Sequence, residues 1–104
     1  METLPFRFGI VTGTFDCSKN NLTSLKWAPK EVGEDFGCDG NELTSLEGAP
    51  IEVGRNFGCR FNNLTSLEGA PKKVGEDFWC NNNKKLFTIE EVEAVSRVEK
   101  SIYV

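Results

Sequence analysis

Four cysteines are the residues of this 104-residue chain whose type and spacing could carry chemistry. They recur every 21 residues, as Cys17, Cys38, Cys59 and Cys80. Four thiols could bind a metal ion, form disulfides or supply a nucleophile. The chain has no histidine, so the commonest general base and the commonest metal ligand are both missing.

The regular spacing favours a structural role for these thiols. Metal ligands must converge on one point, whereas residues at a fixed period in stacked repeats form a column with a spacing of about 4.8 Å. Neighbours in such a column are within disulfide range by their Cα distance, but side chains that point the same way rarely reach the bridge torsion. A reactive thiolate needs an exposed, cationic setting. We therefore expect small buried apolar residues, with no metal site, no cofactor and no catalytic residue.

The cysteines belong to a repeat that must position them. Residues 43–62 read LTSLEGAPIEVGRNFGCRFN, and closely similar runs occupy 22–41 and 64–83. A fixed period in this range is the signature of a solenoid, in which each repeat packs on its neighbours. The alternation Phe-x-Cys predicts a short strand that is parallel and in register with its copies. The Asn three residues after each Cys should turn the chain and bond backbone groups that lack a partner.

The repeat also resembles a known family. The run Phe36-x-Cys38-x-x-Asn41-x-Leu43 is similar to the L-x-L-x-x-N-x-L core of a leucine-rich repeat, and the runs that begin at Phe15 and Phe57 match it again. With the following Leu-Thr-Ser-Leu and the later Pro, the chain resembles short leucine-rich repeat proteins of bacteria and their tailed phages. The resemblance covers roughly residues 4–87. It implies a fold and a habit of binding proteins, without implying a reaction.

We predict an α+β solenoid that forms a single domain over residues 1–104, with about four to five rungs of parallel strands. Residues 1–14 should form an N-terminal cap, 15–87 the repeats, and 88–104 a C-terminal cap of one helix and a final strand. Terminal units must cover a core that has no further neighbour, so departures from the repeat are expected there. In the N-terminal cap, the alternation Phe6-Arg7-Phe8 predicts a short strand over the open end.

The C-terminal cap shows its own signals. Thr88 and Glu91 form a capping-box pair, which predicts that a helix begins there. The helix should bury one apolar face, formed by Ile89, Val92 and Val95. Beyond it, the spacing Val98-x-x-x-Ile102-x-Val104 matches Val74-x-x-x-Phe78-x-Cys80 and predicts a fifth strand.

Charge and hydropathy limit the classes of partner. The chain carries 12 Lys and Arg against 16 Asp and Glu, for a net charge of −4. This balance argues against nucleic acid, which needs a basic surface, and against a polybasic membrane helix. No apolar run approaches the roughly 20 residues that a membrane span requires. The N-terminus lacks a signal-peptide pattern, and four thiols suit a reducing compartment, so we expect a cytoplasmic protein.

Exposed aromatic and charged side chains are the best candidates for a binding site. The positions between Phe and Cys point away from the core, and they hold Asp16, Gly37, Gly58 and Trp79. We expect Arg60, Phe61 and Trp79 to gather at one end of this face, since Trp, Phe and Arg are common in protein-binding hot spots. Asp16 and Asp39 complete the candidate set, with Asp39 paired to Arg60 across adjacent strands. The alternative for Trp79 is that it covers the bare surface above Gly58.

The leading hypothesis is a non-enzymatic protein-binding module that uses the exposed strand face. The family resemblance suggests a phage or bacterial protein that acts on a host or defence component. The alternative is a structural protein that self-associates through an exposed sheet edge. We do not expect an enzyme, because histidine, a phosphate-binding Gly-rich loop and a nucleophile elbow are all missing.

Overall fold

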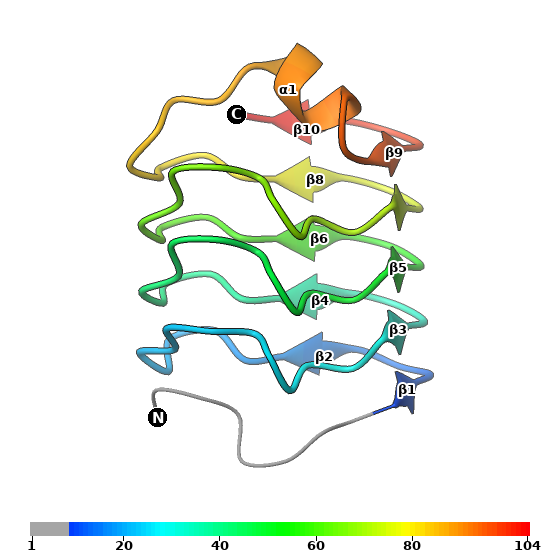
Figure 1. The fold of residues 1–104 in the computed structure, drawn as a ribbon. Helices are drawn as coiled ribbons and strands as arrows, with labels where there is room; N and C mark the ends of the chain where they lie inside the picture. Colours follow the sequence, from blue (N-terminus) through cyan, green and yellow to red (C-terminus); the bar gives the residue numbers. More distant parts are fainter. Residues whose placement is uncertain (1–8) are drawn as a thin grey trace.

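The computed structural model describes residues 9–104, and the predicted strand Phe6-Arg7-Phe8 lies outside these residues. The chain forms a β-solenoid of about four turns, with parallel strands, one short helix near the C-terminus and a final strand (Figure 1). The predicted solenoid is confirmed. Each turn stacks directly on the one before it, so residues 21 positions apart lie side by side.

Each turn contributes two strands, which form two separate parallel sheets. The phenylalanine sheet contains β2 (Phe15–Asp16), β4 (Phe36–Gly37), β6 (Phe57–Gly58), β8 (Phe78–Trp79) and β10 (Ile102–Tyr103). The valine sheet contains β1 (Ile10–Val11), β3 (Glu31–Val32), β5 (Glu52–Val53), β7 (Lys73–Val74) and β9 (Arg97–Val98). The strand at Phe-x-Cys was predicted, but the valine sheet was not.

The core consists of columns of identical residues. Phe15 stacks on Phe36 with ring centroids 5.7 Å apart, and Phe36 stacks on Phe57 at 5.6 Å. Phe57 and Phe78 are 5.0 Å apart but tilted by 46°. The leucines of the Leu-Thr-Ser-Leu segments are buried in the same way, and each fully buried Leu or Phe contributes about 1.5–3 kcal/mol of hydrophobic stabilisation.

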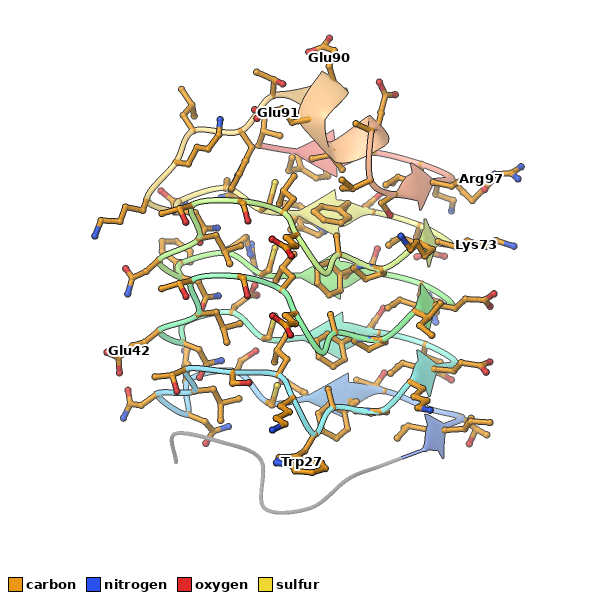
Figure 2. The ribbon with its side chains drawn as sticks, in the orientation of Figure 1. Trp27, Glu42, Lys73, Glu90, Glu91 and Arg97 are labelled. Carbon is orange, nitrogen blue, oxygen red and sulfur yellow. The ribbon has the colours of Figure 1, made fainter. Side chains whose placement is uncertain are left out.

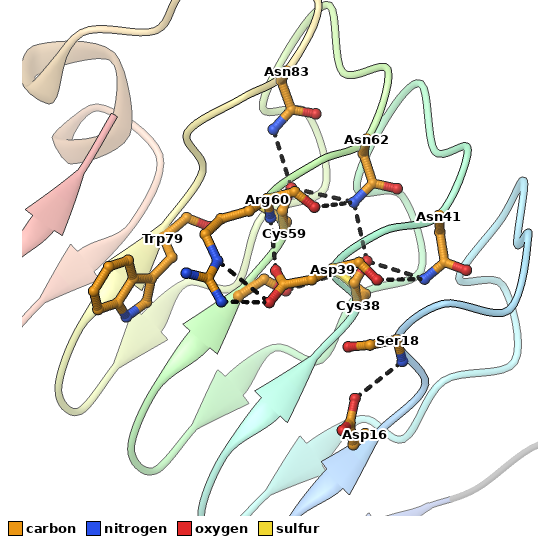
Figure 3. Close-up of polar contacts among 11 residues, drawn as sticks. Asp16, Ser18, Cys38, Asp39, Asn41, Cys59, Arg60, Asn62, Trp79 and Asn83 are labelled. Carbon is orange, nitrogen blue, oxygen red and sulfur yellow. Dashed lines mark hydrogen bonds and ion pairs between the residues drawn. The ribbon is translucent and has the colours of Figure 1, made fainter.

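Asparagine side chains connect neighbouring turns along a second column (Figure 3). The amide nitrogen of Asn62 donates to the carbonyl of Cys59 in its own turn, at 3.2 Å, and to that of Cys38 in the preceding turn, at 3.0 Å. Its amide oxygen accepts the N–H of Leu43, also in the preceding turn, at 3.1 Å. Asn41 repeats this pattern one turn earlier. The predicted role of these asparagines is therefore confirmed, and the backbone groups that they bond belong to their own turn and to the preceding one.

A further polar column, which was not predicted, lies just before each phenylalanine. The side-chain oxygen of Asp35 accepts the N–H of Asn56 in the following turn, at 3.0 Å. The side-chain oxygen of Asn56 accepts the N–H of Asp77 at 3.0 Å. The side-chain oxygen of Asp77 accepts the N–H of Ser101, also at 3.0 Å. Because these strands are only two residues long, side chains supply part of the bonding between turns that longer strands would supply by backbone alone.

The bend between the two sheets brings backbones into close contact. A Cβ atom at Gly54 would overlap the carbonyl of Gly33 in the preceding turn. Only glycine allows this approach, which explains why Gly follows each of the three central strands of the valine sheet, β3, β5 and β7.

The C-terminal cap is formed by α1 (Ile89–Glu93) and strands β9 and β10. Thr88 and Glu91 form the predicted capping box. Val98 pairs in register with Val74, and Ile102 with Phe78, so the predicted final strand is confirmed. The predicted apolar face was wrong: Val92 is buried, but Ile89 is 45% exposed and Val95 37% exposed. A helix of five residues turns only once over the core, which leaves room for one inward side chain.

We predict that Asn62→Asp lowers the free energy of unfolding by about 1–3 kcal/mol, because a carboxylate cannot donate to the two cysteine carbonyls. Urea titration followed by circular dichroism measures this loss. Asn63→Asp is the matched control, since Asn63 is exposed and the same chemical change there should alter stability by less than about 0.5 kcal/mol. Equal stability of the two variants would contradict the role assigned to Asn62.

Candidate functional site

The outer face of the phenylalanine sheet contains a hollow of about 300 Å³. Its floor includes Gly37 and Gly58, which lack side chains. Four of the five candidate residues line it, namely Asp16, Asp39, Arg60 and Trp79. The fifth, Phe61, does not line the hollow and follows Arg60 at the corner where the chain leaves the sheet.

Arg60 is held firmly by Asp39 (Figure 3). One guanidinium NH₂ group donates to a carboxylate oxygen of Asp39 at 3.0 Å, and Nε donates to the same oxygen at 3.4 Å. The backbone N–H of Arg60 donates to the other carboxylate oxygen at 2.7 Å. The predicted pair of Asp39 and Arg60 is therefore present. It fixes the Arg60 side chain, which remains 37% exposed, in one orientation.

Trp79 lies between residues of the turns on either side of it. The Arg60 guanidinium comes from the preceding turn and lies 5.1 Å from the centroid of the indole. Tyr103 comes from the following strand and stacks on the indole at 3.8 Å, with 12° between the planes. Trp79 also pairs in register with Gly58. Trp79 thus packs against Arg60 and Tyr103, whereas the atoms nearest to a Cβ built at Gly58 are the carboxylate oxygens of Asp39. The half-buried Trp79 side chain still borders the hollow.

Tyr103 also belongs to this cluster and was not among the residues predicted for the site. The signal was available, because the spacing that places Ile102 over Phe78 also places Tyr103 over Trp79. Tyr103 is 41% exposed and forms the end of the row that runs from Asp39 through Arg60 and Trp79.

Phe61 has the most unusual backbone of the candidates. Its ring is 58% exposed, and its φ is 55°, in the left-handed region. The same column holds Lys19 with a φ of 58°, Gly40 with a φ of 68° and Asn82 with a φ of 61°. Glycine and asparagine are the residues that tolerate this region best, so a phenylalanine is unexpected there.

The rest of the hollow is acidic. Asp16 accepts the backbone N–H of Ser18 at 3.0 Å, and Asp35 accepts that of Asn56 at the same distance. With Asp39, three carboxylates line the hollow against the single cation of Arg60. The hollow therefore has a negative charge that suits basic side chains.

The four cysteines are free and buried. Cys59 donates its S–H to the carbonyl of Trp79 at 3.3 Å, and its backbone N–H reaches the same oxygen at 2.8 Å. Cys38 bonds the carbonyl of Gly58 in the same way. Burial raises the pKa of all four thiols, to about 12 for Cys17, where the charge of Asp16 adds to the effect, and to about 11 for Cys80. The predicted burial of the four cysteines is confirmed. Because the thiolate is the reactive form, the raised pKa values lower their reactivity in the folded chain.

Residues 9–104 contain no group of three or more Cys, Asp or Glu side chains arranged to hold a metal ion. Within the same range, no helix is both long and apolar enough to cross a membrane. Comparison with protein-family models, with curated proteins and with solved structures gives no match. The leucine-rich repeat resemblance thus remains an expectation from the motif.

We predict that the native protein reacts with iodoacetamide at pH 8 at least about 100-fold more slowly than the urea-unfolded chain. A pKa of about 11 in place of the ordinary 9.0 lowers the thiolate fraction of Cys80 by about that factor. Mass spectrometry counts the labelled thiols at each time point. Rapid labelling of any thiol in the native protein would contradict the assigned burial.

The raised pKa values also predict how stability varies with pH. Below pH 9 the thiols are protonated in both states, whereas from about 9 to 11 they ionise only in the unfolded chain. The free energy of unfolding should therefore fall as pH rises through this window. In a variant with all four cysteines changed to alanine, the free energy of unfolding should not show the part of this decrease that comes from the thiols.

Proposed function

We propose that this protein is a non-enzymatic binding protein that docks a protein partner on the outer face of the phenylalanine sheet and at the adjoining corner. The observation that carries the proposal is Phe61, an aromatic ring that is 58% exposed on a left-handed backbone with a φ of 55°.

Folding alone does not account for a phenylalanine at this position. A left-handed backbone costs a non-glycine residue about 1–2 kcal/mol, and the exposed ring recovers little of this by burial. Gly40 and Asn82 show that the column accepts residues that suit the conformation better. A cost in stability at an exposed aromatic residue is explained if the ring contacts a partner, since such residues dominate many binding interfaces.

The neighbouring surface indicates the chemistry of the partner. Phe61 requires an apolar pocket, whereas the carboxylates of Asp16 and Asp35 in the hollow suit basic side chains. Asp39 already holds Arg60 in place, so Arg60 can engage a partner with little further loss of side-chain entropy. The expected partner surface therefore combines an apolar recess with nearby lysine or arginine.

Two further arguments support a binding role over an enzymatic one. The chain resembles leucine-rich repeat proteins, a family that commonly binds proteins, and the resemblance suggests a host or defence component of bacteria as the partner in a cytoplasmic setting. The cysteines, which are the strongest candidates for chemistry by residue type, are buried with raised pKa values. This part of the proposal rests on the motif and on residue chemistry.

Phe61→Asn separates binding from stability. Asparagine suits the left-handed backbone, as Asn82 does one turn later, so the free energy of unfolding should be unchanged or higher. Binding to the partner should weaken by about 10-fold or more, as expected for loss of a hot-spot residue. Affinity capture from bacterial lysate identifies the partner, and titration of the purified partner measures the change.

Leu86→Asn is the matched control, because Leu86 is 84% exposed but lies outside the candidate site. It should bind as the wild type does. Asp16→Asn tests the acidic hollow separately, because it removes one negative charge but keeps a side-chain oxygen for the N–H of Ser18, and it should weaken the same interaction. If Phe61→Asn and wild type bind the partner equally well, the proposed site is wrong.

A further inference from the structure

We propose that the outer face of the valine sheet binds a second copy of this chain in antiparallel orientation. The proposal rests on the order of charges along this sheet and is independent of the function proposed for the phenylalanine sheet.

The outward positions of four successive valine-sheet strands form one column of charges. The register places these residues side by side in the order Glu31, Glu52, Lys73 and Arg97. Lys73 and Arg97 extend from this side of the molecule, away from the core (Figure 2). The column is thus acidic in its first half and basic in its second half.

This order is unfavourable in a single molecule. Glu31 lies beside Glu52, and Lys73 lies beside Arg97, and like charges on adjacent strands repel each other. Glu52 and Lys73 are register partners of opposite sign, but no ion pair joins them among those in residues 9–104. Arg97 pairs through Nε with Glu99 at 2.9 Å, and its side chain is still 77% exposed.

The neighbouring column shows the arrangement that a single molecule can satisfy. It holds residues of alternating sign, in the order Glu34, Arg55, Glu76 and Lys100. Glu76 forms ion pairs at 3.7 Å with Arg55 below it and with Lys100 above it. The same turns therefore carry one column in which charges of opposite sign alternate and one in which like charges are neighbours.

A two-fold axis parallel to the strands, between β5 and β7, would bring opposite charges together along the column that runs from Glu31 to Arg97. This operation reverses the order of turns, so Glu31 of one copy faces Arg97 of the other, and Glu52 faces Lys73. Each of these pairs then occurs twice, as a two-fold interface requires. The charge order is thus complementary to itself in this orientation.

The shape of the face also allows close approach. A hollow of about 640 Å³ runs along the valine sheet beside the charged column. Its lining includes Gly33, Gly54 and Gly75, which present no side chains. Long charged side chains of a second copy can enter this hollow and reach the opposing column.

Charge reversal provides the test, measured by sedimentation equilibrium at about 10 mM and about 300 mM salt, where screening lengths differ severalfold. Wild type should dimerise at low salt and dissociate as salt rises. Glu52→Lys places Lys opposite Lys twice in the dimer, and Lys73→Glu places Glu opposite Glu twice. Each variant alone should therefore be monomeric.

A 1:1 mixture of Glu52→Lys and Lys73→Glu should dimerise again, because each reversed charge then meets its opposite in the other chain. The matched control is a mixture of Glu42→Lys and Lys84→Glu, which has the same net charges. Glu42 and Lys84 lie outside the valine-sheet hollow, and Glu42 is on the side opposite Lys73 (Figure 2). These two control variants should dimerise alone as the wild type does.

Three results would overturn the proposal. The first is a monomeric wild type at about 10 mM salt and millimolar protein. The second is unchanged association of the single variants, including growth beyond a dimer, which would indicate end-to-end stacking instead. The third is a monomeric mixture of Glu52→Lys and Lys73→Glu. Circular dichroism of each variant confirms that it is folded before the comparison is made.

Discussion

Hydrogen bonding between successive turns is the constraint on which this structure depends. Each strand is two residues long, so backbone pairing within the sheets accounts for only a small part of each turn. The remaining backbone groups need partners, since unpaired buried N–H and C=O groups are costly. Backbone groups of the neighbouring turn pair with many of them, such as the N–H of Glu42 with the carbonyl of Leu22 at 2.8 Å. Asparagine amides supply further partners on one side of the core, and the column from Asp35 to Asp77 supplies them on another. Cysteine thiols add a second donor to carbonyls that already accept a backbone N–H.

This constraint separates the positions that hold the fold from those that are free to vary. Inward and bridging positions repeat almost unchanged from turn to turn, because each must fit identical neighbours. The outward positions differ between turns, and both proposals rest on them. On the phenylalanine sheet they produce an acidic hollow, a fixed Arg60 and the exposed ring of Phe61. On the valine sheet they produce a column of charges in which like charges are neighbours. The two surfaces are built on different strands, so one can change without the other.

Sequence periodicity predicted the features that recur with every turn. The Phe-x-Cys strand, the bridging asparagines and the final strand at Ile102 all follow from spacing alone. The valine sheet was missed because a strand of two residues, with one apolar member, shows no alternation to detect. The exposure of Ile89 and Val95 depends on where the short helix ends, which its sequence does not mark clearly. Among the site residues, the pairing of Arg60 with Asp39 was predictable from their adjacent turns. The left-handed backbone of Phe61 could have been inferred only by comparing it with Gly40 in the same column.

The most direct test of the central claim is amide hydrogen exchange measured residue by residue by NMR. The N–H groups of Leu22, Leu43 and Leu64 donate to asparagine side-chain oxygens of the following turn, at 2.9, 3.1 and 3.0 Å. If side-chain bonds hold the turns together, these amides should exchange as slowly as those of Cys38 and Cys59, which donate to backbone carbonyls. Fast exchange of the leucine amides, with slow exchange of the cysteine amides, would show that the asparagines do not hold the stack and would contradict this account.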